Sequence, residues 1–242
     1  KEILKRTESE AERIRKIIRE LLDFSRPSPG IEEQVDINGV IAHALSLLSH
    51  QKKIWEQIQV VKELQENLPP WLGDPHQLQQ VMINLFLNAL DALTSSTLRA
   101  GPGEKKLRVA TCALTKDEGN ELAENSSQRR KEDSPAVDYS LLRTQEKPWV
   151  RTPGEILSII RIDVEDTGPG ISPEAMGQIF DPFYSTKPPG EGTGLGLAIC
   201  LRIVEAYDGR IFAKSEEGKG TTFTILLPVL PSLHRGECVG IT

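Results

Sequence analysis

Apolar residues recur along residues 1–25 at alternating spacings of three and four positions, with charged residues between them. This spacing predicts an amphipathic helix with a heptad-like stripe of the kind that pairs helices. Prolines in the segment RPSPG at 26–30 end the pattern, because proline cannot continue a helix. We therefore expect a separate helix over 1–26 and a linker over 27–33. The helix either packs on its own domain or dimerises, and its separation by proline and glycine favours dimerisation.

Apolar strand-like runs and amphipathic helical patterns alternate over residues 34–230. Asp36 and Asp74 are expected helix N-caps, and Pro75 is an expected first helical residue. We expect strands at 34–35, 58–64, 106–114 and 156–166, helices at 38–49, 75–93, 172–180 and 194–207, and a final hairpin around a Gly-Lys-Gly turn. This order predicts an α/β fold: a two-layer α/β sandwich with helices on one face of a mixed sheet.

Residues 115–154 interrupt this order with a polar, charge-mixed stretch that has no sustained period. A connection of this length between two strands is either disordered or functional. We expect a mobile insertion, part of which Tyr139, Leu141, Leu142 and Trp149 could hold down, and a C-terminal tail over 231–242.

The composition narrows the class of protein. The chain has 242 residues and a net charge of −6, which argues against broad binding to nucleic acid or anionic membranes. Cys112, Cys200 and Cys238 fit neither a disulfide framework nor a metal site, and indicate a reducing compartment. No apolar run is long enough to span a membrane, and the chain starts without Met inside a helical pattern. We expect a cytoplasmic fragment, which is compatible with the cytosolic part of a membrane-bound sensor.

The segment DPFYSTKPPGEGTGLGLAI at 181–199 carries glycines and a lysine and runs directly into an apolar helix. Glycines let backbone N–H groups approach a polyphosphate, and a helix N-terminus adds partial positive charge. The usual phosphate loop, GxxxxGK followed by Ser or Thr, is absent. The segment therefore indicates a nucleotide site of another kind.

Two further patches carry suitable chemistry. Asn84 and Asn88 share one face of an almost wholly apolar helix, where amide oxygens either hold Mg²⁺ on ATP phosphates or link the core. Asp166 ends a buried strand and is followed by Gly168 and Gly170. Its carboxylate could accept a hydrogen bond from the exocyclic amine of adenine, or the segment is a plain turn.

Phe180 and Phe183 flank Asp181 and Pro182 just before the glycine-rich segment. They either anchor the base of a flexible lid or are ordinary core aromatics, and the sequence favours neither.

The motifs Asn-x-x-x-Asn, Asp-x-Gly-x-Gly, Phe-Asp-Pro-Phe and Gly-Thr-Gly-Leu-Gly-Leu follow one another in fixed order. With them the chain resembles the catalytic and ATP-binding domain of bacterial sensor histidine kinases, in the wider family of gyrase, Hsp90 and MutL ATPases. The resemblance covers about 31–230 without the insertion, looks most like kinases of the nitrogen-regulation type, and implies a Bergerat-type ATP-binding fold. Residues 1–25, ending LLDFSRP, resemble the second helix of the dimerisation and phosphoacceptor domain.

The resemblance also implies roles for individual residues. Asn88 would be the Mg²⁺ ligand, Asn84 would lie near the phosphates, Asp166 would bind adenine, and Lys187 would reach the phosphates from the lid. Thr221 and Thr222 stand where the family often places a hydroxyl near adenine. The implied nucleotide-binding set is Asn84, Asn88, Asp166, Gly168, Gly170, Lys187, Gly192, Thr193, Gly194, Leu195, Gly196 and Thr222.

The chain departs from the family's patterns in two places. Hydrolytic relatives carry a glutamate where this chain has Asn84, so efficient ATP hydrolysis is not expected. None of the four histidines, His43, His50, His76 and His234, is followed by an acidic residue or lies on the first helix. We expect the phosphoacceptor histidine on a helix upstream of Lys1, and so no catalytic residue and no autophosphorylation within this chain.

The resemblance implies a two-component histidine kinase that transfers the γ-phosphoryl group of Mg-ATP to that histidine. A response-regulator aspartate would then receive it, the parent protein would be a homodimer, and nucleic acid would not be a partner. Two alternatives stay open: a hydrolytic ATPase or serine kinase of the same fold, and a non-enzymatic nucleotide-sensing dimerisation module. Asn84 weighs against the ATPase, LLDFSRP against the serine kinase, and Asn88 with the lid glycines against an inactive module.

Overall fold

The computed structural model describes residues 32–49, 57–94, 105–123, 158–188 and 192–229. The expected helix over 1–26, nearly all of the linker, most of the insertion and the tail over 231–242 lie outside these residues.

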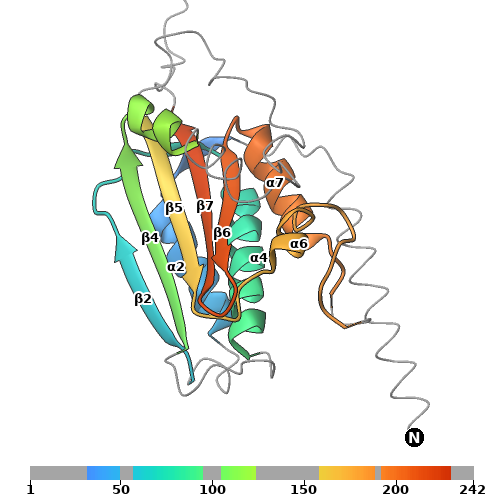
Figure 1. Cartoon of the computed structure of the whole chain (residues 1–242). Coiled ribbons are helices and arrows are strands. Elements are labelled where there is room, and N and C mark those ends of the chain that lie inside the picture. The colour runs from blue at the N-terminus through green and yellow to red at the C-terminus, as the bar shows by residue number, and fades with distance from the viewer. Residues whose placement is uncertain (1–31, 50–56, 95–104, 124–157, 189–191, 230–242) are drawn as a thin grey trace, which may run out of the picture.

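A five-stranded mixed sheet forms one layer of the fold (Figure 1). Its order is β2 (Gln59–Leu64), β4 (Lys106–Leu114), β5 (Ser158–Asp166), β7 (Gly220–Val229) and β6 (Arg210–Glu216). The β2–β4 pair is parallel and the other pairs are antiparallel. The helices α2 (Ile37–Leu48), α4 (Pro75–Thr94) and α7 (Gly196–Ala206) cover one face, and α6 (Pro173–Met176) is a single turn. This confirms the predicted two-layer α/β sandwich.

The core lies between the sheet and α4. Period-2 alternation sends Ile160 and Ile162 of β5 and Ile225 of β7 towards the helices, where each is fully buried. Leu85 and Phe86 are likewise fully buried on α4. Most of the circumference of α4 is apolar and packs in this core. The site described below is built on polar positions of the remaining surface of the helix.

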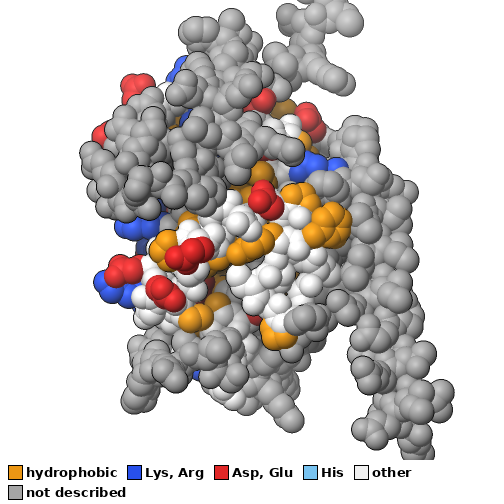
Figure 2. All heavy atoms as spheres, turned by 45° about the vertical axis from the view of Figure 1, so that its right-hand side comes forward, with side chains coloured by type: hydrophobic (Ala, Val, Ile, Leu, Met, Phe, Trp, Pro, Cys, Tyr) orange, Lys and Arg blue, Asp and Glu red, His pale blue; other side chains and the backbone are white. Residues whose placement is uncertain are grey.

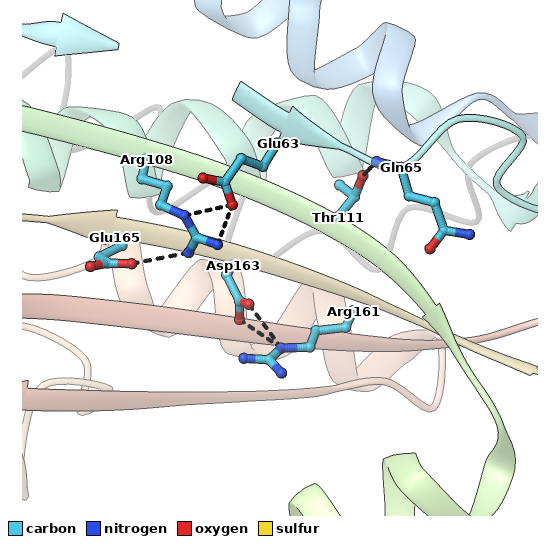
Figure 3. Close-up of polar contacts among 7 residues, drawn as sticks. All are labelled: Glu63, Gln65, Arg108, Thr111, Arg161, Asp163 and Glu165. Carbon is cyan, nitrogen blue, oxygen red and sulfur yellow. Dashed lines mark hydrogen bonds and ion pairs between the residues drawn. The ribbon is translucent and has the colours of Figure 1, made fainter. Parts of the chain in front are cut away.

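The opposite face of the sheet carries ion pairs between strands and within β5 (Figure 3). Arg108 on β4 bonds the Glu63 carboxylate on β2 at 2.5 Å and the Glu165 carboxylate on β5 at 3.1 Å. Nε of Arg161 lies 2.8 Å from the Asp163 carboxylate, which also accepts a hydrogen bond from the Thr224 hydroxyl at 2.7 Å. This difference between the two faces explains why α2, α4 and α7 pack on the apolar one.

The predicted helix starts are confirmed at two positions. Asp74 Oδ1 accepts the backbone N–H of His76 at 2.7 Å, and α4 begins at Pro75 as expected. The Ser172 side chain accepts the backbone N–H of Ala175 at the start of α6. Asp36 occupies the N-cap position of α2, but its side chain makes no capping hydrogen bond there.

One strand escaped prediction from the sequence. β3 (Trp71–Gly73) pairs antiparallel with β1 (Glu33–Val35) and forms a separate two-stranded sheet. Trp71 is buried edge-on against Tyr207, with ring centroids 4.7 Å apart, and the Tyr207 hydroxyl accepts the backbone N–H of Asp74 at 3.2 Å. β3 therefore fastens the end of α7 to the start of α4.

The first residues of the expected insertion, 116–123, form a helix, and the mobility expected of the insertion stays a prediction. Thr115 and Glu118 form a capping box: the Glu118 N–H donates to Thr115 Oγ1 at 3.3 Å, and the Thr115 N–H donates to Glu118 Oε2 at 2.8 Å. Ala123 packs with Ile159 and Leu226 on the sheet face opposite α4. The remaining residues of the insertion lie outside the described part of the chain.

Within the described ranges, no helix has the length and apolar character needed to cross a membrane. The cytoplasmic location expected from the sequence stays a prediction.

Candidate nucleotide site

The helix α4 is the axis of the candidate site. Asn84, Asn88 and Ala92 follow one another at spacings of four and so lie along one helix face. A rise of 1.5 Å per residue puts about 12 Å between the first and the last of these positions. Each end of this face meets one of the glycine motifs that the sequence indicated.

At one end, Asn84 meets the start of α7. Its Nδ2 donates to the Gly196 carbonyl at 3.2 Å, and its side chain also bonds the Cys200 thiol. No side chain caps the N-terminus of α7. The partial positive charge of this helix end is therefore available to a bound anion. Asn84 thus links the core, which was one of the two interpretations left open.

The base of the glycine-rich loop is closed just before α7. The Phe183 N–H donates to the Gly194 carbonyl at 2.9 Å, and the described residues between these two, 183–188 and 192–194, are here named the lid loop. Gly194 has φ +69°, and a Cβ there would lie 2.4 Å from the Phe183 carbonyl carbon. This left-handed turn is why α7 begins at Gly196 and not at Gly194, where it was expected.

Asn88 lies one turn further along α4 and differs from Asn84. It is half-buried, and among the described residues its side chain has no hydrogen-bond partner. A polar amide held at a half-buried position without a protein partner is a candidate ligand-binding group. Its oxygen is a hard ligand of the kind that Mg²⁺ takes.

At the other end, Asp166 closes β5 with only 4% of its surface exposed. Its Oδ1 accepts the Gly168 N–H at 2.8 Å. Burial raises the pKa of Asp166 to about 6, while hydrogen bonds from the backbone N–H groups of Gly168 and Thr221 oppose that rise. A Cβ on Gly168 would lie 2.6 Å from Asp166 Oδ1 and 2.8 Å from the Cβ of Ala92, so this glycine separates Asp166 from α4.

Gly170 anchors the turn after Asp166 against the β6–β7 hairpin. It has φ +74°, and a Cβ would lie 2.3 Å from the Glu216 carbonyl oxygen. We expect Gly170→Ala to lower the free energy of unfolding by about 2–3 kcal/mol, through backbone strain plus this clash. Gly218 is a matched control, since it has φ +81° and no neighbour within 4 Å, so Gly218→Ala should cost only about 1 kcal/mol. Urea titration measures both, and equal losses would contradict the role given to the clash.

The strand register separates the two threonines. Thr221 is the partner of Asp166 across β5 and β7, so their side chains share the helix-covered face. Thr222 is the partner of Glu165 and points to the opposite face, so the structure does not bring it to the site. The Thr221 hydroxyl lies 2.9 Å from the Ser215 hydroxyl.

The lid loop brings Lys187 to α4. Its ammonium group forms an ion pair with Asp91, a residue that sequence reasoning missed although it stands three positions after Asn88. Gly192 is packed so that a Cβ would lie 2.5 Å from the Ser185 hydroxyl. Thr193 Oγ1 accepts the Leu195 N–H at 3.4 Å, and the Leu195 side chain is fully buried, so only its backbone could face a ligand.

The two phenylalanines have different environments. Phe180 is partly buried against Phe223, edge-on with ring centroids 6.5 Å apart. Phe183 is 63% exposed and has φ +69°. Phe180 is thus a core aromatic, whereas Phe183 stands at the base of the lid loop.

Figure 2 shows acidic and apolar side chains scattered over one side of the molecule. Lys and Arg side chains lie at its margins, so the described residues visible there form no broad basic patch.

Comparisons with known proteins agree with this geometry. Residues 73–231 match the family model described as histidine kinase-, DNA gyrase B-, and HSP90-like ATPase. The sensor histidine kinase ZraS of Escherichia coli (strain K12) is 31% identical over 220 residues, which are 91% of this chain and 36% of ZraS. The sensor kinase CckA of Brucella abortus (strain 2308) is 32% identical over 227 residues, which are 94% of this chain and 20% of CckA. The chain therefore spans well under half of these relatives.

Solved structures show the same fold. Full-length ShkA in complex with AMPPNP has a TM-score of 0.59 at 22% identity, over 89% of this chain and 36% of ShkA. The histidine kinase ThkA in complex with the response regulator TrrA has a TM-score of 0.58 at 20% identity, over 93% of this chain and 49% of ThkA. The shared sheet, the Asn-bearing α4, the uncapped α7 and the family match lead to one conclusion: the chain belongs to the histidine kinase-, DNA gyrase B-, and HSP90-like ATPase family.

Proposed function

We propose that the chain is the catalytic domain of a two-component sensor histidine kinase. It would bind Mg-ATP and transfer the γ-phosphoryl group to a histidine on a dimerisation helix outside this sequence, for relay to a response-regulator aspartate. The observation that carries the proposal is the half-buried Asn88 amide, which has no partner among the described residues. It lies on α4 between the uncapped start of α7 and the buried Asp166.

Asp166, Asn88 and the N-terminus of α7 would each have one role. The Asp166 carboxylate accepts a hydrogen bond from the adenine amine, and the N-terminus of α7 holds phosphate oxygens with its free N–H groups. The Asn88 oxygen would hold Mg²⁺ together with the phosphates. No cluster of three or more His, Cys, Asp or Glu side chains suited to a metal occurs within the described ranges. That suits a magnesium ion held mainly by substrate phosphates, and the ion would offset phosphate charge.

The structure gives a physical reason to favour phosphoryl transfer over hydrolysis. The family resemblance puts Asn84 at the position where hydrolytic relatives carry a glutamate base, and its amide donates to the Gly196 carbonyl. An amide cannot accept the proton of an attacking water. Transfer to a histidine needs no such base, because the neutral imidazole nitrogen attacks phosphorus directly, forming the N–P bond as the bond to ADP breaks.

The proposed partners follow from the relatives and from charge. ZraS and CckA are named as sensor kinases, and ThkA was solved with a response regulator. A receiver domain is therefore the proposed acceptor after the histidine, and the longer protein is proposed to be a homodimer. The net charge of −6 does not suit a nucleic-acid partner.

A phosphoryl-transfer assay tests the proposal. The chain is incubated with γ-labelled ATP and Mg²⁺, with and without a histidine-bearing dimerisation helix supplied as a separate polypeptide. We expect acid-labile label on the added helix and none on this chain. Label on this chain, acid-stable label on a serine, or phosphate release without label on the helix would each contradict the proposal and support an alternative.

A further inference from the structure

The lid loop carries one cation to α4, and that cation has an acidic partner. Lys187 and Asp91 form an ion pair although they are 96 positions apart in the sequence. The side chains are 33% and 54% exposed, respectively, so water and solutes reach both groups. A solvent-accessible pair of this kind can exchange partners easily.

The place of the pair makes such an exchange relevant to the site. Asp91 is three positions after Asn88 and therefore lies beside it on the helix surface. The Lys187 backbone N–H donates to the Ser185 hydroxyl at 3.2 Å, and the loop is closed at its base by the Phe183–Gly194 bond. The ammonium group is thus held within about one helical turn of the proposed magnesium ligand.

We propose that Asp91 is a positioning residue that holds Lys187 when no nucleotide is bound and competes with the ATP phosphates for it. This inference rests on the proposed function. ATP binding would transfer the lysine from the carboxylate to the more highly charged triphosphate. The affinity for ATP is then lower than it would be if Lys187 had no partner.

The expected size of this competition is small and measurable. An exposed ion pair changes an equilibrium constant by about twofold to fivefold. Asp91→Asn keeps the shape of the side chain and removes the competitor, so it should tighten Mg-ATP binding by that factor. Lys187→Gln should weaken binding, because it removes the cation for which both partners compete.

A double-mutant cycle separates competition from simple repulsion between Asp91 and ATP. Dissociation constants for Mg-ATP are measured by isothermal titration for the native chain, Asp91→Asn, Lys187→Gln and the double variant. If Asp91 acts through Lys187, Asp91→Asn tightens binding in the native background and has no effect in the Lys187→Gln background. Asp117→Asn is the control for net charge, because Asp117 is exposed on the helix over 116–123, which packs on the other face of the sheet.

The outcomes are distinct. Equal tightening in both backgrounds would mean direct repulsion and would overturn the inference, as would no change or weaker binding in Asp91→Asn. Tightening by Asp117→Asn as large as that by Asp91→Asn would overturn it too. A native chain that binds no Mg-ATP would overturn the proposed function itself. Thermal unfolding of each variant confirms that the comparison is made on folded protein.

Discussion

Replacing Asn88 with alanine is expected to weaken Mg-dependent ATP binding at least about 100-fold and to leave the fold intact. The proposed role of the amide is to hold the metal on the phosphates, so its loss removes the magnesium-dependent part of the affinity. Stability should not fall, because the side chain has no hydrogen-bond partner among the described residues and alanine favours a helix. Isothermal titration with and without Mg²⁺, together with thermal unfolding, measures both effects.

Asn84→Ala is the matched control, one turn away on the same helix. It removes the hydrogen bond from the Asn84 amide to the Gly196 carbonyl, at a cost of about 1 kcal/mol. Its main effect should therefore be on stability, with a smaller change in affinity. The division of roles is wrong if Asn88→Ala is the more destabilising change, or if it binds Mg-ATP as the native chain does.

The sequence predicted the fold well where each element has a strong local signal. The strands expected at 106–114 and 156–166, the Asp74–Pro75 start of α4 and the Gly-Lys-Gly hairpin are all found. β3 was missed because three residues after two prolines carry no periodicity. That strand exists through its pairing with β1 and the burial of Trp71, which are tertiary effects.

The helix over 116–123 was missed for a different reason. Its local signal was present, since Thr115 and Glu118 have the spacing of a capping box. The polar composition of the segment outweighed that signal, because too few apolar positions recur to show a period. The helix is held by two small buried residues, Gly119 and Ala123, on the outer face of the sheet.

The site could be predicted in residue type but not in detail. Two asparagines at a spacing of four do not reveal which amide is bonded within the protein, and only the contact with Gly196 separates them. Neighbouring residues of a strand point to opposite faces of the sheet, and the sequence does not tell which of the two faces the site. Thr221 shares the face of Asp166, whereas Thr222, which the resemblance placed in the nucleotide-binding set, points to the other face. The partner of Lys187 could not be found from local pattern, because lid loop and helix meet only in the folded chain.

Asp166→Asn is expected to stabilise the fold at pH 7.5 while weakening ATP binding at least about tenfold. Burial raises the pKa of Asp166 from 3.8 to about 6, so the fold favours the protonated acid. This contribution to stability is complete below pH 4 and is lost as the pH rises through 6. The ionised carboxylate therefore costs up to about 3 kcal/mol at neutral pH, since each pKa unit corresponds to 1.36 kcal/mol. Asparagine cannot ionise and should remove about 1–3 kcal/mol of that cost.

Urea unfolding from pH 4.5 to 7.5 measures this effect, and the advantage of the variant should shrink towards the acidic end. Asp163→Asn is the control on the same strand and opposite face; it should lower stability, because Arg161 loses its carboxylate partner, and leave ATP binding unchanged. A loss of stability in Asp166→Asn at pH 7.5, or an advantage independent of pH, would contradict the account.

Asp166→Asn should bind ATP more weakly although it is more stable, because adenine binding needs the ionised carboxylate that burial disfavours. The carboxylate already accepts backbone N–H groups from Gly168 and Thr221 and keeps further lone pairs for the adenine amine. Asparagine has one acceptor oxygen, and its NH₂ group would face another donor. In the native chain, affinity for ATP should likewise fall as the pH drops below 6, whereas the variant should show no such step. Asp166 is thus a buried carboxylate that lowers the stability of the fold, and a role in binding ATP explains why the chain carries it.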